Sequence, residues 1–472
     1  MTVAREAEPE RASPAERPAK RENALRVVWT LAWPVVALNA LQVINTLVDR
    51  SFIGHLDTAA LTGHGGATNV MFLAFSLAVA LAAGPTAIVS RAFGAGDKRE
   101  TRAASRQSLA ASVYVGLAVA ALIYFGAEWA ARAILPARDG AAIRNMADFT
   151  RVYALGIPAT FMIQTLAASL RGIGDTKSPM VLSGGQIALH IGLNVLLIPR
   201  LGLVGAAVAL SISGWVAAVV YILWSARTPL RTRPPLLPPN PGWTVRLLRI
   251  AVPAAVMSTL RVASLTAFTV ALALGPGASE AIAAMTTAFA IESVLFAPAF
   301  GLSAAAGTLV GQSLGMEDPR RAERLAWTCV GFALVSVVLF IVPVAAFTPQ
   351  IATALLGGKP AIVHEAVTLI RFLCATELLF CTAMVLFGAM QGAGDTVRPL
   401  WISIFSLWGM RVPLAFFLTL GAGTAIGWGL VLPFGAALGP TGAWLAMTIT
   451  QGVQGLLAIW AFRAGAWKTR SV

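Results

Sequence analysis

Charged residues are scarce in this sequence, since Asp, Glu, Lys and Arg make up only 12% of its 472 residues whereas 57% are hydrophobic. Soluble domains are about a quarter charged, and a soluble fold of this length needs more polar surface than these residues supply. The mean hydropathy of +0.76 points the same way. The composition therefore excludes an ordinary soluble protein and indicates an integral membrane protein, whose lipid-facing side chains can be apolar.

Signatures of several enzyme classes are also missing. The three cysteines, Cys329, Cys374 and Cys381, lie in apolar segments without CxxC spacing, which excludes a disulfide framework and indicates small buried side chains. Neither GxxxxGKS/T nor HExxH occurs. We therefore expect no nucleotide hydrolysis, no zinc peptidase chemistry, no cofactor and no bound metal. An active process in this protein must then draw on an ion gradient.

Positive charge is abundant, with a net charge of +14. On a soluble chain this excess would suggest a nucleic-acid partner. Here the basic residues lie in short stretches between apolar segments and are not interleaved with aromatic residues as base stacking requires. We expect no nucleic-acid partner, and the positive-inside rule accounts for the charge better.

About twelve apolar segments are long enough to cross a membrane, which takes about 20 residues. With the N-terminus in the cytoplasm, about 25 of the 35 basic residues fall on the inner side and about 8 on the outer side, as the positive-inside rule requires. We therefore predict a multi-pass protein with both termini cytoplasmic. The Arg-rich basic set indicates a GC-rich genome and hence a bacterial cytoplasmic membrane. The segments lie near 27–52, 67–92, 107–127, 147–170, 179–200, 203–225, 246–272, 281–311, 326–347, 366–390, 399–421 and 440–463.

The two halves of the chain are related in sequence. RGIGDTKSPM (171–180) matches QGAGDTVRPL (391–400) at a shift of 220, and residues 90–103 match 311–324 at a shift of 221. Several matches in one order at nearly one shift indicate an internal repeat. Six helices per half is an even number, so both repeats point the same way across the membrane, with the substrate path between them.

These features predict an all-α integral membrane fold of about twelve transmembrane helices, built as two six-helix bundles related by a parallel internal repeat. The second half carries extra residues near 422–437, whose structure the sequence leaves open. The predicted parts are a disordered cytoplasmic tail (1–25), an N-terminal bundle (26–226), a Pro-rich cytoplasmic linker (227–245), a C-terminal bundle (246–464) and a cytoplasmic C-terminal tail (465–472).

A GxGD motif occurs three times, each time in a basic inner loop at the end of an apolar segment. One interpretation is an intramembrane aspartyl protease, which requires two facing carboxylates at membrane depth. The loop positions instead favour a tight glycine turn whose Asp caps the next helix. The residues concerned are Gly94, Asp97, Gly174, Asp175, Gly394 and Asp395.

Charged residues within apolar segments are costly and therefore informative. Asp49 is preceded by Gln42 and Asn45, at spacings that place all three on one helix face. Such a stripe should face a cavity or a partner helix, unless Asp49 and Arg50 only mark the outer interface. His190 and Asn194 also share a face, which suggests either proton handling or a buried structural histidine.

Four further charges lie within apolar segments of the second half, namely Arg261, Glu292, Glu377 and Arg411. Arg261, Glu292 and Glu377 are candidates, with Gln42 and Asn45, for polar residues that line a cavity. The alternative is that the two carboxylates pair with the two arginines.

Several motifs follow one another along nearly the whole chain after residue 25. They are Pro34 followed by VDRSFIGHLDTAALTG, then VSRAFGAGD, LRGIGDTKSP and LGLVGAAVA in the first half, and GQSLG, PRRAE and MQGAGDTVRP in the second. In this order and spacing they resemble the multidrug and toxic compound extrusion (MATE) transporters. The resemblance implies two six-helix bundles forming a V that opens alternately to either side. It also implies export of amphipathic, often cationic compounds in exchange for protons or sodium, with the family's first-helix Asp at Asp49.

The sequence departs from the family pattern at several positions. His190 and Asn194 stand where many members carry an NxxxD pattern, and Leu210 stands where a Thr is frequent. In the second half, Arg261 and Phe380 replace residues that are often Glu and Asp in sodium-coupled members. Because sodium prefers oxygen ligands, these departures favour protons over sodium as the coupling ion, with Asp49, His190 and Asn194 as the coupling residues.

The leading hypothesis is therefore a proton-coupled exporter of drug-like or metabolite small molecules, acting as a monomer in membrane lipid and not an enzyme. A lipid-linked precursor flippase of the same superfamily is the nearest alternative, although such relatives have more helices and a basic cavity that only Arg261 and Arg411 hint at here. The intramembrane protease is the alternative from a different class.

Overall fold

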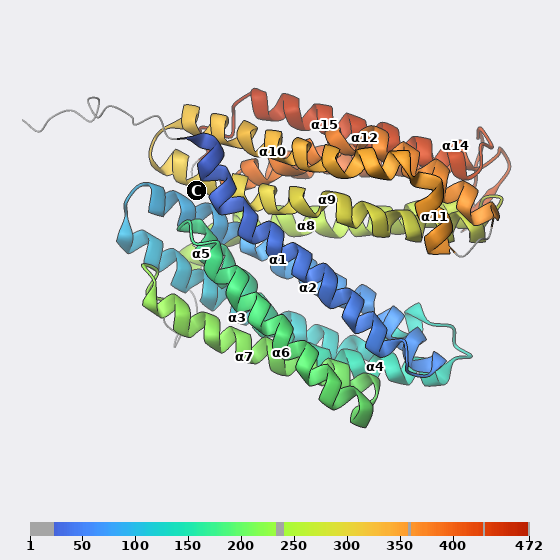
Figure 1. Cartoon of the computed structure of the whole chain (residues 1–472), viewed down its shortest axis with the longest axis horizontal. Coiled ribbons are helices and arrows are strands. Elements are labelled where there is room, and N and C mark those ends of the chain that lie inside the picture. The colour runs from blue at the N-terminus through green and yellow to red at the C-terminus, as the bar shows by residue number, and fades with distance from the viewer. Residues whose placement is uncertain (1–22, 233–239, 357–359, 428–429, 471–472) are drawn as a thin grey trace, which may run out of the picture.

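The computed structural model describes residues 23–232, 240–356, 360–427 and 430–470. Helices make up nearly all of this part of the chain and form two bundles, which meet at one end and diverge toward the other (Figure 1). The predicted tail lies outside the described residues except for its last three, and so does the middle of the predicted linker.

Helices α1–α7 form the first half of the molecule and α8–α15 the second. The helices of the first half are α1 (Ala24–Ile53), α2 (Thr58–Gly94), α3 (Lys98–Ile134), α4 (Gly140–Ala154), α5 (Ile157–Gly172), α6 (Lys177–Leu201) and α7 (Leu203–Arg227). The helical elements of the second half are α8 (Pro241–Ala273), α9 (Ala278–Gly315), α10 (Pro319–Ala346), α11 (Thr348–Leu356), α12 (Pro360–Gly392), α13 (Val397–Ser403), the π-helix η2 (Ile404–Arg411), α14 (Val412–Thr419) and α15 (Pro440–Arg463).

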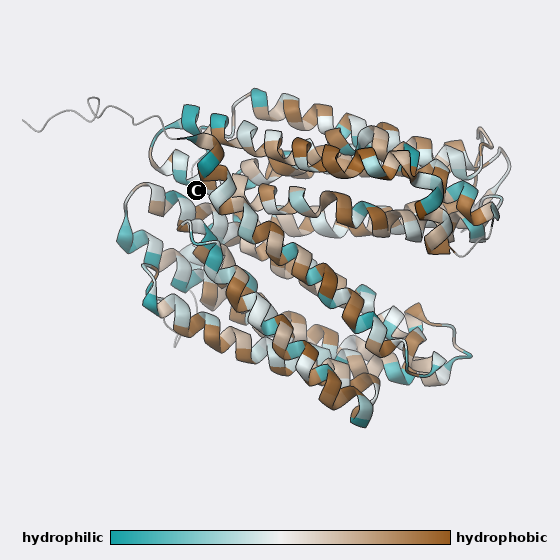
Figure 2. Cartoon of the chain, in the orientation of Figure 1, coloured by the Kyte–Doolittle hydropathy of each residue, from teal (hydrophilic) through white to brown (hydrophobic). Residues whose placement is uncertain are grey.

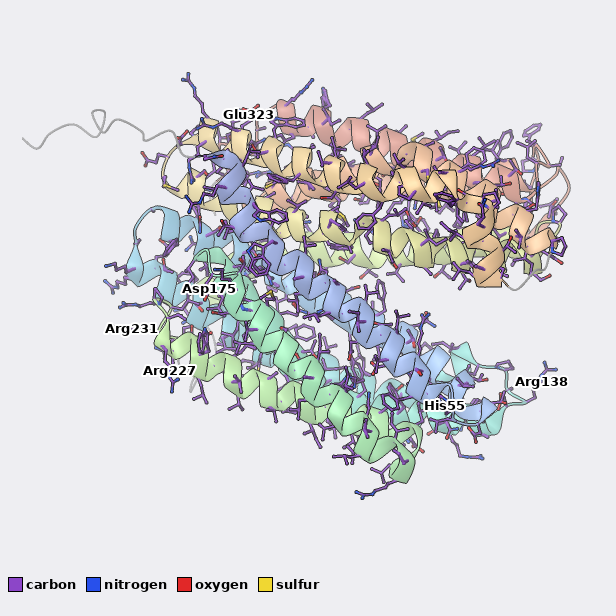
Figure 3. All side chains as sticks on the ribbon, viewed as in Figure 1. His55, Arg138, Asp175, Arg227, Arg231 and Glu323 are labelled. Atoms are coloured by element: carbon purple, nitrogen blue, oxygen red, sulfur yellow. The ribbon has the colours of Figure 1, made fainter. Side chains whose placement is uncertain are left out.

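Among the described residues, 11 helices are long and apolar enough to cross a membrane, and the number rises to 12 when the bent pair α4–α5 counts as one span. Hydrophobic residues fill the middle of the helices and hydrophilic ones gather at their ends (Figure 2). Asp175, Arg227, Arg231 and Glu323 lie toward the end where the bundles meet, whereas His55 and Arg138 lie at the opposite end (Figure 3). The prediction of about twelve membrane helices in two bundles is confirmed.

The fourth span, expected near 147–170, consists of two helices. It bends by 48° between α4 and α5, because Pro158 at the start of α5 disfavours continuous helix at the residues before it. The carbonyl groups freed at the bend bind side chains of α7. Ser211 Oγ donates to Val152 O at 3.0 Å, and Trp215 Nε1 donates to Leu155 O at 2.9 Å.

The eleventh span contains the π-helix η2 between α13 and α14. Pro413 comes directly after it at the start of α14, and a proline lacks the N–H and crowds the carbonyl group one turn earlier. The extra residue per turn of a π-helix relieves that conflict and shifts the register of α14 relative to α13. Trp408 Nε1 ties this segment to α8 by donating to Leu260 O at 3.0 Å.

The extra residues near 422–437 form a small antiparallel hairpin of β1 (Ala425–Gly427) and β2 (Leu430–Val431). An isolated bridge between Gly421 and Ala436 closes its base. The segment that the sequence left open is therefore a surface hairpin between α14 and α15.

The first helix of each half also packs into the other half. Besides α6, helix α1 packs against α9 and α10, and α8 packs against α2 and α3 as well as against α13–α14. Val28 and Leu31 of α1 belong to the hydrophobic core of the second half. Leu247 and Ile250 of α8 belong to the core of the first half. A movement of α1 or α8 therefore changes the packing in both halves.

Glycines allow the halves to touch at the joined end, where α2 crosses α9. A Cβ atom on Gly94 would lie 2.0 Å from Gln312 O, and one on Gly315 would lie 2.1 Å from Arg91 O. Gln312 Nε2 also donates to Gly172 O at 2.9 Å. The contact is thus one of backbone against backbone, with no space for larger side chains.

The GxGD loops lie at this joined end and cap helices. Gly96, Gly174 and Gly394 have φ values of 73°, 87° and 85°, which glycine adopts at no steric cost. The following aspartates accept hydrogen bonds from the first turn of the next helix, for example Asp97 Oδ1 from Glu100 N at 2.8 Å, Asp175 Oδ1 from Ser178 N at 2.9 Å and Asp395 Oδ1 from Arg398 N at 3.4 Å.

The C-terminal residues 464–470 lie across both halves at the same end. Trp467 is fully buried and stacks on Phe462 with ring centroids 4.7 Å apart. The carbonyl group of Arg470 accepts from Arg91 of the first half, while its guanidinium lies 3.9 Å from Asp395 of the second half. This segment reinforces the joined end.

We expect Gly315→Val to separate the halves at the joined end, because the added side chain meets the backbone of Arg91. Spin labels at Lys98 and Arg320, which are exposed on either half, should report a longer distance in this variant. Gly331→Val is the matched control, since no atom lies within 4 Å of a Cβ there. An unchanged distance distribution in a folded Gly315→Val protein would contradict the expectation.

Candidate functional site

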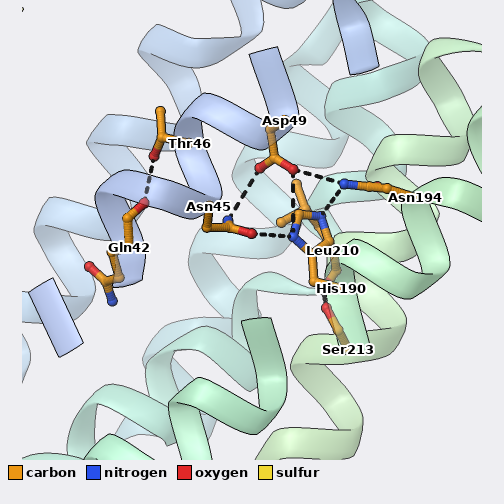
Figure 4. A network of polar contacts seen from close by, with 8 residues as sticks. All are labelled: Gln42, Asn45, Thr46, Asp49, His190, Asn194, Leu210 and Ser213. Atoms are coloured by element: carbon orange, nitrogen blue, oxygen red, sulfur yellow. Dashed lines mark hydrogen bonds and ion pairs between the residues drawn. The ribbon is translucent and has the colours of Figure 1, made fainter. Parts of the chain in front are cut away.

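The polar stripe of α1 faces α6. Helix α1 presents Asn45 and Asp49 one turn apart, and α6 presents His190 and Asn194 with the same spacing (Figure 4). Residues four apart lie above one another on a helix face, so each helix offers a pair of polar side chains to the other. The structure therefore brings the three predicted coupling residues, Asp49, His190 and Asn194, into one cluster.

Hydrogen bonds link these four side chains. Asp49 Oδ1 accepts from Asn194 Nδ2 at 2.8 Å, and Asp49 Oδ2 accepts from Asn45 Nδ2 at 3.3 Å. The ring of His190 bridges the helices, with Nδ1 3.2 Å from Asn45 Oδ1 and Nε2 3.2 Å from Asn194 Nδ2. A neutral imidazole with its proton on Nδ1 satisfies both contacts, because Nδ1 then donates and Nε2 accepts.

The network is buried on its α6 side and partly open on its α1 side. His190 and Asn194 are 3% and 1% exposed, whereas the Asp49 side chain is 21% exposed. His190 Nδ1 also lies 3.7 Å from Asp49 Oδ1. Both oxygens of Asp49 therefore accept N–H donors, which suits an ionised carboxylate in a place that small cations can reach.

Protonation of Asp49 changes this arrangement. A protonated carboxyl group carries an O–H donor and is a weaker acceptor than a carboxylate, and each oxygen of Asp49 faces an amide N–H group. Loss of the negative charge weakens the hydrogen bonds that Asp49 accepts from Asn45 and Asn194, and the bond from Asn194 is the one that joins α1 to α6.

Gln42 is outside this network. It lies on α1 about two turns before Asp49 and is exposed. Its backbone carbonyl group accepts a hydrogen bond from Thr46 Oγ1 at 3.0 Å. No hydrogen bond of its side chain is found among the described residues. Its role as a cavity-lining residue stays a prediction.

The carboxylates of the second half form a separate buried cluster. Glu292 Oε1 of α9 lies 3.4 Å from Gln451 Nε2 of α15, and Thr376 Oγ1 of α12 donates to Gln451 Oε1 at 2.9 Å. Glu377 Oε1 lies 3.2 Å from Cys381 Sγ one turn further along α12, and Glu377 Oε2 has no hydrogen-bond partner in the described structure.

The two arginines of the second half make few contacts. Arg411 Nε donates to Thr450 Oγ1 at 3.1 Å, and Arg411 interacts electrostatically with Glu292 and Arg261. Within the described ranges, the side-chain contacts of Glu292 and Glu377 are to Gln451 and Cys381, and neither carboxylate forms an ion pair with an arginine. Glu292 thus acts on Arg411 from beyond 4.0 Å, and pairing of the carboxylates with the arginines stays a prediction.

Sequence reasoning missed the buried polar residues of α15. Thr450, Gln451 and Gln454 are at most 2% exposed. Their spacing on an otherwise apolar helix is the same signal that identified the stripe of α1. The segment GQSLG (311–315) also fits the GxSxG pattern of serine hydrolases. Its Ser313 lies inside α9, is fully buried and accepts from Arg321 Nη1, so the hydroxyl is not exposed as a nucleophile.

Two repeated bundles of membrane-spanning helices with an ionisable network between helices define a multi-pass membrane transporter. The MatE family model matches residues 34–196 in the first half and 253–417 in the second, so the chain belongs to the MATE family. The resemblance stated from the motifs is thereby confirmed, as is the prediction that the protein is a transporter and not an enzyme.

Relatives match over nearly the full length. The probable multidrug resistance protein NorM of Thermotoga maritima is 27% identical, over 94% of this chain and 93% of its own. The protein of the same name from Rhodopseudomonas palustris is 26% identical, over 95% and 94%. A solved structure described as the outward-facing conformation of a multidrug resistance MATE family transporter superposes with a TM-score of 0.85 at 20% identity, covering 95% of this chain and 97% of that one. That likeness establishes the fold.

We expect Asn194→Leu to lower the apparent unfolding temperature, because the leucine has similar size but leaves Asp49 and His190 without the amide donor. Leaving a buried polar group unpaired costs about 1–3 kcal/mol. Asn69→Leu is the matched control, since Asn69 is exposed on α2. Equal unfolding temperatures for the two variants would show that the network contributes no stability.

Proposed function

We propose that this MATE transporter exports amphipathic small molecules that carry a cationic group, in exchange for protons and by alternating access. The observation that carries the proposal is the Asp49 carboxylate, which accepts amide donors from both α1 and α6 and is still 21% exposed. A cationic substrate and a proton both require this anion, and only one of them can occupy it. Competition for a single carboxylate is the simplest way to couple two opposite fluxes.

The coupling step depends on the position of α1. When Asp49 gains a proton, its bond to Asn194 weakens and α1 can move relative to α6. Because α1 also packs against α9 and α10, its movement alters the contact between the halves. Pro34, buried within α1, interrupts the backbone hydrogen bonds and supplies a place where the helix can bend.

Protons suit the site better than sodium does. Amide nitrogens and an imidazole ring surround the carboxylate, whereas hard cations require several oxygen ligands. In the described part of the chain there is also no group of three or more His, Cys, Asp and Glu side chains suited to a metal ion.

The direction of export depends on the orientation in the membrane. The joined end carries the basic loops that the positive-inside rule assigns to the cytoplasm, and Arg227 and Arg231 lie at that end (Figure 3). We therefore propose that the structure is open to the outside, with cytoplasmic termini, in a bacterial cytoplasmic membrane. The relatives named as multidrug resistance proteins support a drug-like substrate. We further propose that the protein acts as a monomer surrounded by lipid.

The two alternative functions are an intramembrane protease and a lipid-linked precursor flippase. The intramembrane protease has no support, because Asp175 and Asp395 cap helices at the joined end instead of facing each other within the membrane. A lipid-linked precursor flippase belongs to the same superfamily, and the arginines of the second half are the feature that it would use. Failure of this protein to transport any cationic dye is the outcome that favours the flippase.

We expect inside-out vesicles containing this protein to accumulate a fluorescent cationic dye when a pH gradient is imposed. An uncoupler should abolish the uptake, and Asp49→Asn should reduce the initial rate at least about tenfold, since a charge-assisted contact is worth about 1.5–3 kcal/mol. Asp148→Asn is the matched control, because this aspartate is exposed on α4.

Two results would count against the proposal. Wild-type rates for Asp49→Asn under a pH gradient would remove Asp49 from the coupling mechanism. Uptake that depends on a sodium gradient and not on a pH gradient would replace the coupling ion while leaving export in place.

A further inference from the structure

The internal repeat places Arg261 where the first half has Gln42. Pro34 of α1 and Pro253 of α8 are related by a shift of 219, and the same shift relates Gln42 to Arg261 and Asp49 to Phe268. The second half therefore has the aromatic side chain of Phe268 in place of the carboxylate, and the guanidinium group of Arg261 about two turns before it.

The repeat also relates Arg411 to His190. The shift of 220 between the GxGD loops of α6 and α13 would pair His190 with Met410. The π-helix η2 contains one extra residue per turn, which moves the match by one position to Arg411. In the last helix of each half, LGLVGAAVAL (201–210) matches LGPTGAWLAM (438–447) at a shift of 237. At this shift Thr450, which accepts the hydrogen bond from Arg411 Nε, corresponds to Ser213 of α7.

The helices concerned pack in the same way in both halves. Helix α1 packs against α6, and α8 packs against α13, η2 and α14. The face that holds an anion and a neutral network in the first half thus holds two cations in the second half. The two related faces have opposite polarity.

Arg261 has no counter-ion in its own half. Among the described residues it forms no hydrogen bond and no ion pair, although it lies in the middle of α8 and is partly buried. Arg411 has only Thr450 within hydrogen-bond distance, and Glu292 acts on it from beyond 4.0 Å. An unpaired guanidinium group at membrane depth is costly. An anionic group from outside the second half, such as one on a bound substrate, would stabilise these two arginines.

The carboxylates of the second half form no ion pair with Arg261 or Arg411. Glu292 is held toward Gln451, which is itself fixed by Thr376. Glu377 is directed to Cys381. Because α8 lies between the halves, packing against α2 and α3 of the first half, a substrate between the halves could reach Arg261.

We propose that Arg261 and Arg411 form a subsite for a carboxylate group of the exported compound. The inference rests on the proposed function, and it narrows the substrate class to zwitterionic amphipaths, with the cationic group toward Asp49 and the carboxylate toward the two arginines. Guanidinium groups bind carboxylates with two parallel hydrogen bonds, which an ammonium group cannot reproduce.

The test uses a matched pair of dyes, a zwitterionic rhodamine with a free carboxylate and the methyl ester of the same dye, which is a pure cation. Uptake into inside-out vesicles under a pH gradient is measured for both dyes, with protein-free vesicles to correct for leakage. The readout is the ratio of kcat/KM for the free acid to that for the ester. This ratio cancels differences in protein amount and in the driving force.

We expect wild-type protein to favour the free acid and Arg261→Gln to lower the ratio about tenfold, the effect of losing one charge-assisted hydrogen-bonded contact. Arg261→Lys, which keeps the charge, should retain part of the preference. Arg371→Gln is the matched control, because this arginine is exposed on α12, and its ratio should equal that of the wild type.

The outcomes separate the inference from the function on which it rests. If the ester is transported but the wild type shows no preference for the acid, or if Arg261→Gln keeps the wild-type ratio, the subsite is wrong and cation export stands. If neither dye is transported, the proposed function fails and the subsite fails with it.

Discussion

Backbone hydrogen bonding dominates this structure, because lipid offers no partner to an exposed N–H or C=O group. Long helices satisfy these groups internally, and the exceptions are repaired by neighbours. At the bend between α4 and α5, Ser211 and Trp215 of α7 bind the freed carbonyl groups. At this bend, irregular backbone is found where another helix supplies donors. At the π-helix the direction is reversed, since Trp408 of η2 donates to Leu260 O of α8.

The same constraint explains how much of the fold could be predicted. Hydropathy located every span, since a segment of about 20 apolar residues has few alternatives in lipid. Hydropathy could not locate the break at Leu155, because the apolar pattern runs through it and the cause is the local conflict at Pro158. The π-helix was likewise invisible, since its sequence has the composition of any membrane helix.

The site was predictable to the extent that polarity is rare in such helices. Asn45, Asp49, His190 and Asn194 stood out because each lies on an apolar helix, but their spacing said nothing about which helices face each other. That pairing depends on the packing of α1 against α6. Gln451, by contrast, was overlooked because uncharged residues were given less weight than charged ones, although its contacts organise the second cluster.

The glycine contact between α2 and α9 has a consequence for energetics. Backbone atoms touch across Gly94 and Gly315, and Gln312 adds a side-chain hydrogen bond to Gly172 O. A contact of backbone against backbone can open without withdrawing large side chains from a partner surface. A change of only about 5.5 kcal/mol reverses a two-state population from 1:99 to 99:1, which is within reach of ligand binding. Small residues at this crossing thus make the joined end a contact that binding energy can open and close.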